Sequence, residues 1–306
     1  MRRLLLVANP SASGFTGALF RDVSSILSET YEVTAAWPDG PDEARHSAEQ
    51  AARSGYDVVV AMGGDGVVHH VGNGLVHTDT ALGVLPLGTT NVLARILGLP
   101  RNPNKAARTL ASATRGRLPL AHIATESRAG AGSRYALFSL GIGFDADVVT
   151  IAEQRPYSKV RFGSIHYART AVGRLFGHYR TKAPNLRIEC LGDAVDAVTL
   201  LVQVHHLFTY FGRIPLALSR QPTDGLTAAA VERVAPLPAA GIVSRLGTRR
   251  DLGKMDGITV WQDFHKLVVH AEPQAPFQAD GELLGLTGGL EVTPVPSGLL
   301  VLTPGG

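Results

Sequence analysis

The stretch Met62–Gly66, Met-Gly-Gly-Asp-Gly, sets one carboxylate among three glycines directly after the apolar run Asp57–Ala61. That run is typical of a buried strand, and the glycines let backbone N–H groups of the following turn approach an anion closely. An aspartate held there can serve a phosphate-bound magnesium ion or a reacting hydroxyl group. The pattern favours a nucleoside triphosphate and phosphoryl transfer, although a tight strand-to-helix turn without a ligand would read the same way.

Two further polar turns follow predicted strands. The strand Arg3–Ala8 leads into the turn Asn9–Gly14, and the strand Ala81–Leu85 leads into the turn Pro86–Asn91. In an open parallel sheet such turns lie at one edge, the carboxyl edge, where ligands bind. We therefore expect the three turns to meet.

Backbone groups in these turns are the main candidates for holding a nucleotide, because the chain has neither a Walker A motif nor the protein-kinase signatures. Glycine N–H groups would bind phosphate, Thr89 would donate its hydroxyl, and the two asparagines would fix the nucleotide. The predicted nucleotide-binding residues are Asn9, Gly63, Gly64, Asp65, Gly66, Gly88, Thr89 and Asn91.

Several short motifs follow one another along the chain. They are Asn-Pro-x-x-Ser-Gly at 9–14, Gly-Gly-Asp-Gly at 63–66, Asn-Gly-Leu at 73–75, Pro-x-Gly-Thr-x-Asn at 86–91, Gly-x-Gly-x-Asp-Ala at 141–146, Asp-Gly-Leu at 224–226 and Asp-Gly-Glu at 280–282. In this order and spacing they resemble the diacylglycerol kinase catalytic superfamily, which includes soluble bacterial lipid kinases and sphingosine kinases. The resemblance covers nearly the whole chain.

The resemblance implies catalytic roles for three acidic residues. Asp65 would hold catalytic magnesium or its water shell, or would orient the acceptor hydroxyl. Asp280 would act as the base or hydroxyl-orienting group at the cleft between domains, with Glu282 beside it. The residues alone favour a hairpin turn at Asp280, because Asp-Gly is the commonest signal for one.

A metal site is also implied. In the family, a structural magnesium is held by an aspartate carboxylate and neighbouring backbone carbonyls, and the matching positions are Asp224, Gln221 and Leu226. Magnesium prefers oxygen ligands and retains waters, so one carboxylate can suffice. An Asp-Gly turn without an ion remains the alternative.

The chain departs from the family pattern at several positions. Val67 replaces a threonine, His69 and His70 replace an Asn-Glu pair, Val92 replaces an aspartate, and the family's triple glycine becomes Phe-Gly-Arg, ending at Arg213. Adjacent histidines on a helix point in different directions, so we expect no metal site there. Arg213 could narrow the acceptor pocket or bind an acidic group, and the departures put the acceptor in doubt more than the nucleotide.

The 306 residues are enough for two domains. Strands and helices alternate over residues 1–120, with helices expected at Phe15–Ser28, Pro41–Ser54 and Asn104–Thr114, which predicts a doubly wound α/β nucleotide-binding domain. Residues 121–287 predict an antiparallel, β-sandwich-like acceptor-binding domain. From the resemblance, the segment from about 288 to 306 returns to the first domain. The predicted strands after residue 120 are Ala121–Thr125, Ser133–Leu140, Asn185–Cys190, Ala194–His205, Leu226–Val234, Gly257–Val260 and Lys266–Glu272, with two more in Gly288–Pro304.

Two segments of the second domain are open to a lipid-related interpretation. A helix expected over Tyr157–Tyr179 carries arginines that form either a solvated surface or a basic rim beside a lipid-entry groove. The segment Pro236–Met255 is either a lid over the acceptor site or an ordinary crossover.

Composition narrows the partners and the compartment. A net charge of +3 without a recognised motif argues against a nucleic-acid partner, and the single cysteine, Cys190, excludes an intrachain disulfide and fits a reducing compartment. No apolar run reaches the roughly 18 residues of a membrane span, and the one after Met1 is too short for a signal peptide. We expect a cytoplasmic protein that contacts membranes transiently.

These observations lead to an ATP- and magnesium-dependent lipid kinase as the first hypothesis. A primary hydroxyl of diacylglycerol or a related lipid would attack the γ-phosphate in line. The alternatives are a kinase with a soluble or specialised acceptor (NAD kinase-like, or acting on an amino alcohol or sphingoid base) and a nucleotide-binding protein with little catalysis. The sequence leaves open the acceptor and whether the protein is a homodimer.

Overall fold

The computed structural model of the chain describes residues 1–125, 134–144, 146–147, 182–211, 214–218, 225–233, 253 and 255–305. The chain separates into two units, Met1–Leu120 with Pro296–Gly306, and Ala121–Val295. The helix predicted at 157–179, nearly all of the segment 236–255, and Arg213 lie outside the described residues. Within the described part of the chain, no helix is both long and apolar enough to span a membrane.

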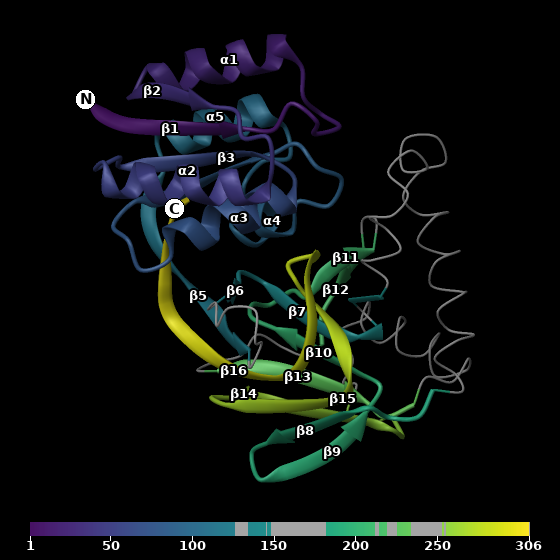
Figure 1. Ribbon diagram of the computed structural model, residues 1–306. Coiled ribbons are helices and arrows are strands. Elements are labelled where there is room, and N and C mark those ends of the chain that lie inside the picture. The colour runs from purple at the N-terminus through teal and green to yellow at the C-terminus, as the bar shows by residue number, and fades with distance from the viewer. Residues whose placement is uncertain are drawn as a thin grey trace. The chain divides into compact units, whose positions relative to one another are not determined.

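The first unit is built on a parallel sheet (Figure 1). Its strand order is β4-β3-β1-β2, and the end of β16 pairs in parallel with β4, Val301 opposite Leu82. Every residue of β3 and β4 is buried, as expected for parallel strands that helices cover on both faces. The predicted doubly wound α/β fold and the return of the C-terminal segment are confirmed. The strands are β1 (Arg2–Ala8), β2 (Tyr31–Ala36), β3 (Val58–Gly63), β4 (Ala81–Pro86) and β16 (Glu282–Thr303).

Helices of the first unit pack in two pairs, α1 with α5 and α2 with α3 (Figure 1). The chain leaves β1 in one direction to reach β2 and crosses back to reach β3, so right-handed crossovers put α1 and α2 on opposite faces. A Cβ atom on Gly74 would lie 2.5 Å from the carbonyl oxygen of Arg45, so α2 and α3 approach closely because Gly74 has no side chain. The helices are α1 (Gly17–Ser28), α2 (Pro41–Arg53), α3 (Asp65–Leu75), α4 (Val92–Ile96) and α5 (Pro103–Ala111).

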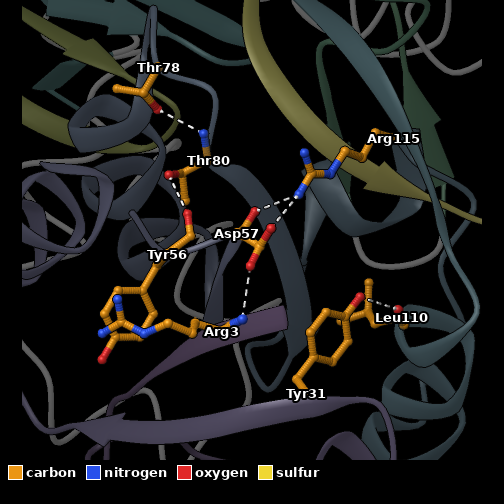
Figure 2. A network of polar contacts seen from close by, with 8 residues as sticks. All are labelled: Arg3, Tyr31, Tyr56, Asp57, Thr78, Thr80, Leu110 and Arg115. Atoms are coloured by element: carbon orange, nitrogen blue, oxygen red, sulfur yellow. Dashed lines mark hydrogen bonds and ion pairs between the residues drawn. The ribbon is translucent and has the colours of Figure 1, made fainter. Parts of the chain in front are cut away.

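Side chains tie the strands together where they begin, at the amino edge of this sheet (Figure 2). The Asp57 carboxylate accepts the backbone N–H of Arg3 at 2.8 Å and lies 3.4 Å from the Arg115 guanidinium. The Arg3 guanidinium lies 4.1 Å from the centre of the Tyr56 ring, and the Thr80 hydroxyl donates to the Tyr56 carbonyl at 2.7 Å. These contacts secure the edge opposite the predicted ligand site.

The second unit is antiparallel, as predicted, with the strand order β14-β13-β10-β7-β15-β16. β8 pairs with β15 and β9, β5 pairs with β6 and β16, and β11 and β12 form a separate ribbon. Its core is apolar and includes Leu140, Ile188, Leu200, Phe264 and Val269. The strands are β5 (Thr114–Thr125), β6 (Arg134–Ala136), β7 (Ser139–Gly143), β8 (Leu186–Cys190), β9 (Asp193–Ala197), β10 (Thr199–Gln203), β11 (Thr209–Phe211), β12 (Ile214–Leu216), β13 (Leu226–Val231), β14 (Ile258–Phe264) and β15 (Leu267–Ala279).

Several predicted boundaries were wrong. The strand expected at 133–140 breaks at Leu137 and Phe138 into β6 and β7, and the one expected at 194–205 breaks into β9 and β10. The two strands expected in 288–304 belong to one long strand, β16. Pro296 is tolerated there because it lies between the pairing with β15, which ends at Val292, and the pairing with β4 at Val301. The first helix begins at Gly17 rather than Phe15, because the Thr16 hydroxyl caps it by accepting the Leu19 N–H.

Candidate active site

Three polar turns meet at the carboxyl edge of the first unit. β1 lies between β2 and β3, so the strand order reverses at β1, and ligands of open α/β sheets bind beside such a reversal. The Asn9 N–H donates to the Met62 carbonyl at 3.1 Å, and the Leu87 N–H donates to the Gly63 carbonyl at 2.8 Å. These bonds join the turn after β1 and the turn after β4 to the end of β3.

Glycines allow the three turns to approach one another at backbone distance. A Cβ atom on Gly88 would lie 2.8 Å from the Gly64 Cα, and one on Gly14 would lie 3.0 Å from the Leu87 carbonyl oxygen. On Gly63 a Cβ would lie 2.7 Å from the Val67 side chain. Peptide groups of the turns therefore lie close together at this edge.

Asp65 is the first residue of α3, and Gly66 lies in the first turn of the helix rather than in the preceding loop. The helix thus begins inside the Gly-Gly-Asp-Gly motif, and its first N–H groups have no partner within the helix. Asp65 Oδ1 accepts the Val92 N–H at 2.7 Å, which joins the start of α3 to the start of α4. The side chain is half-buried and favourably placed, because an acidic group at a helix N-terminus interacts well with the helix dipole.

The two asparagines predicted to fix a nucleotide each hold their own turn. Asn91 has left-handed backbone angles (φ 50°, ψ 58°), its Oδ1 accepts the Gly88 N–H at 2.9 Å, and its amide donates to the Gly88 carbonyl at 2.6 Å. Asn9 Oδ1 accepts the Ser11 N–H at 2.9 Å. Thr89, between Gly88 and Asn91, is exposed.

In the second unit, Asp280 lies in a hairpin turn, as the residues alone predict, and its side chain is buried. Ala279 pairs with Glu282, and the two residues between them have positive φ angles, 57° for Asp280 and 87° for Gly281. A two-residue hairpin turn of this kind requires such angles. Asp280 is only 3% exposed, whereas Glu282 is half-buried at the start of β16.

Three consecutive backbone N–H groups donate to the Asp280 carboxylate. Leu137 N–H reaches Oδ2 at 2.8 Å, and the N–H groups of Phe138 and Ser139 reach Oδ1 at 2.8 and 3.1 Å. These three residues span the break between β6 and β7. The sequence predicted one continuous strand here. The break between β6 and β7 instead provides the N–H groups that bind the Asp280 carboxylate.

His205 adjoins this arrangement and was not among the predicted site residues. It is 5% exposed, and its Nε2 donates to the Leu137 carbonyl at 2.8 Å. Burial lowers the pKa of His205 from 6.5 to about 4, and the neighbouring His206 lowers it too, while the bond to Leu137 and the charge of Asp280 oppose the shift. The imidazole is therefore neutral near pH 7. The position of His205 at the end of a strand-forming run was visible in the sequence. Its hydrogen-bond partner was not, because that partner is the backbone carbonyl group of Leu137.

The predicted metal ligands are only partly described. Gln221 and Asp224 lie outside the described residues, and Leu226 is buried at the start of β13. A Cβ atom on Gly225 would lie 2.5 Å from the backbone of Asp263, so this glycine allows close contact with β14. Among the described residues no group of three or more His, Cys, Asp or Glu side chains could hold a metal ion.

Residues 3–123 match the family described as diacylglycerol kinase catalytic domain. This part of the chain is therefore similar to a diacylglycerol kinase catalytic domain. The matched region runs from β1 into β5 and includes all three turns of the first unit. Asp280 and Glu282 lie outside it, so their roles remain predictions.

Relatives align with the chain over part of their length. It is 36% identical over 105 residues to a diacylglycerol kinase of Bacillus subtilis (strain 168), covering 33% of this chain and 35% of that protein. It is 30% identical over 150 residues to a probable lipid kinase YegS-like of Stenotrophomonas maltophilia (strain K279a), covering 47% and 46%. The alignments thus span about a third to a half of these two relatives.

Solved structures resemble the whole chain. A putative diacylglycerol kinase from Bacillus anthracis str. Sterne matches with a TM-score of 0.75 at 20% identity, over 99% of this chain and 97% of that one. An NAD kinase from Archaeoglobus fulgidus in complex with ATP matches with a TM-score of 0.52 at 13% identity, over 98% and 94%. The chain therefore has the two-domain fold of the solved diacylglycerol kinases.

The contact between Gly88 and Gly64 in the first unit can be tested with two matched substitutions. We expect Gly88→Ala to lower the free energy of unfolding by about 1–3 kcal/mol, because its Cβ would meet Gly64 at 2.8 Å. Gly64→Ala is the control, since its Cβ would lie 3.5 Å from Gly88, an ordinary contact. Urea unfolding followed by circular dichroism measures both, and equal effects would contradict the packing argument.

Acid should weaken the second unit through His205. The folded protein keeps this imidazole neutral down to about pH 4, whereas the unfolded chain protonates it near pH 6.5, so its contribution is complete above pH 6.5 and is lost as pH falls towards 4. The difference between the two pKa values corresponds to about 3 kcal/mol. Urea unfolding from pH 7.5 to 4.5 should show a steeper loss for the wild type than for His205→Gln. Parallel curves would contradict the assignment.

Proposed function

We propose that the chain is a kinase that transfers the γ-phosphate of ATP to the hydroxyl group of a lipid, diacylglycerol or a related molecule. One observation carries the proposal: the three turns that meet at the carboxyl edge of the first unit all lie within the region that matches the diacylglycerol kinase catalytic domain. Proteins similar to this chain are named diacylglycerol kinase and probable lipid kinase. The transfer needs positioned phosphates, neutralised charge and an oriented hydroxyl group.

Backbone groups would hold the phosphates of ATP. The start of α3 offers N–H groups and the positive end of a helix dipole, which together suit an anion. The exposed Thr89 hydroxyl would donate a further hydrogen bond. Asn9 and Asn91 would act through the turns that they hold. The predicted glycine N–H groups in this role are those of Gly63, Gly64 and Gly66. The N–H of Gly88, the fourth glycine predicted, donates to Asn91 Oδ1, so Gly88 would act through the close approach of its turn instead.

Magnesium fits the chemistry of Asp65. A carboxylate beside bound phosphates would repel them unless a cation lay between, and oxygen is the ligand type that magnesium prefers. The bond from the Val92 N–H to Oδ1 keeps the carboxylate in one orientation, so it could hold the ion or its water shell. A magnesium ion held there would neutralise charge on the transferred phosphoryl group. We propose a second, structural ion at Asp224, with the carbonyl groups of Gln221 and Leu226.

The acceptor side of the reaction is assigned to the second domain, residues 121–287, and ATP binding to residues 1–120 with about 288–306. Asp280 would be the base or hydroxyl-orienting group, with Glu282 beside it. Asp280 is held by three N–H groups from Leu137, Phe138 and Ser139, which fixes the direction of its carboxylate. The lipid would be met at a membrane surface by a peripheral, cytoplasmic enzyme.

Asp65→Asn is the cleanest test of this mechanism. An asparagine keeps an oxygen for the Val92 N–H, so the fold should survive while the negative charge is lost. We expect the turnover number to fall by about 10²-fold or more. Asp280→Asn is less clean, because an amide NH₂ group would face backbone N–H donors and the variant would lose stability as well.

The assay is transfer of radiolabelled γ-phosphate, with magnesium and a mixed lipid extract, read by thin-layer chromatography. Asp57→Asn is the matched control, since it makes the same chemical change at the amino edge, opposite the three turns, and should retain activity within about twofold. An asparagine at this position keeps an oxygen for the Arg3 N–H. Label in the organic phase that is lost in Asp65→Asn supports the lipid kinase. Label only in a water-soluble product favours a soluble acceptor instead. Near wild-type turnover in Asp65→Asn removes this residue from the mechanism.

A further inference from the structure

Three strand ends of the second unit lie side by side. β7 is the neighbour of both β10 and β15 and runs antiparallel to each, so its beginning lies beside their ends. Ser139 is opposite Gln203, and Leu140 is opposite Ala279. The residues just after β10 and β15 therefore flank the residues just before β7. His205 follows β10, and Asp280 follows β15.

One peptide group joins His205 to Asp280. The carbonyl oxygen of Leu137 accepts from His205 Nε2 at 2.8 Å, and the N–H of Phe138, in the same peptide plane, donates to Asp280 Oδ1 at 2.8 Å. A carbonyl oxygen can only accept, so Nε2 carries the hydrogen. Hydrogen bonds in series through one peptide polarise each other, so the first bond strengthens and directs the second.

Neither end of this series is open to solvent. His205 is 5% exposed and Asp280 is 3% exposed. A buried carbonyl that lost its donor would be left unsatisfied, and the peptide would turn to find another partner. The Phe138 N–H would turn with it, away from the carboxylate.

We propose that His205 is a positioning residue for Asp280, acting through the peptide group between Leu137 and Phe138. Asp280 is the group that the proposed kinase uses at the acceptor hydroxyl, and the inference rests on that function. His205 contacts neither substrate nor the reacting atoms in this role. Its imidazole keeps the N–H donors aimed at Oδ1, and so keeps the carboxylate in one orientation.

Two substitutions of His205 distinguish the effect of losing the hydrogen-bond donor from the effect of changing the side-chain volume. His205→Gln can present an amide N–H near the position of the imidazole Nε2, whereas His205→Leu fills a similar volume without a donor. Thr199→Val is the matched control. Thr199 is the first residue of β10 and, like His205, is buried; its hydroxyl donates to the Ile142 carbonyl at the other end of β7 at 2.8 Å. Thr199→Val therefore removes a comparable buried hydrogen bond at the end of β7 that is far from Asp280.

The first readout does not depend on activity. In the full-length protein labelled with ¹⁵N-phenylalanine, the Phe138 amide proton should move upfield in His205→Leu and remain near its wild-type position in His205→Gln and Thr199→Val. An unchanged Phe138 signal in His205→Leu would overturn the proposal. The Phe138 signal can be measured even if the wild type transfers no phosphate. Failure to transfer phosphate would count against the proposed function and not against the role of His205.

The second readout is steady-state kinetics with the lipid that the transfer assay labels. We expect His205→Leu to lower kcat at least tenfold with the KM for ATP unchanged, because Asp280 is assigned to the hydroxyl group and not to the nucleotide. His205→Gln should recover kcat to within about threefold, and Thr199→Val should leave it near the wild-type value despite lower stability. Equal losses of kcat in His205→Leu and Thr199→Val would reduce His205 to a structural role and overturn the proposal.

Discussion

Backbone N–H groups at the ends of strands are the constraint on which both parts of the candidate site depend. Each strand end leaves peptide groups without a ladder partner, and buried ones must find another acceptor. In the first unit the three glycine turns gather such groups at one edge, where an anion could satisfy them. In the second unit Leu137, Phe138 and Ser139 already have an acceptor in the Asp280 carboxylate. The same physical requirement thus accounts for the candidate ligand site in the first unit and for an internal hydrogen-bonded carboxylate in the second.

The side chains expected to do chemistry also build the site. Asp65 joins the starts of two helices, Asn9 and Asn91 shape their turns, and Asp280 holds the break before β7. A carboxylate that accepts backbone N–H groups is oriented by the fold, which is the preorganisation that phosphoryl transfer relies on. The same bonds make such residues costly to remove, so conservative replacements report on chemistry better than alanine does.

Much of the first unit could be predicted from the sequence, because its buried parallel strands are continuous apolar runs such as Val58–Ala61 and its turns are rich in glycine. The second unit was harder to predict. Ser133–Leu140 looks like one strand, and its break depends on Asp280, a residue far along the chain. The turn at Asp280 was visible in the sequence, but its burial was not. The role of His205 could not be predicted from the sequence, because its partner is a backbone carbonyl group and every residue has one.

The strand β16 gives the first domain an order of assembly. Its sheet contains β1 to β4, which lie within residues 2–86, but the partner of β4, Val301, comes much later in the sequence. During synthesis on the ribosome, one edge of the buried, apolar strand β4 therefore stays unpaired until the residues around Val301 have been made. Such an edge invites pairing with another chain. The nascent domain thus passes through an aggregation-prone stage that ends when its last strand arrives.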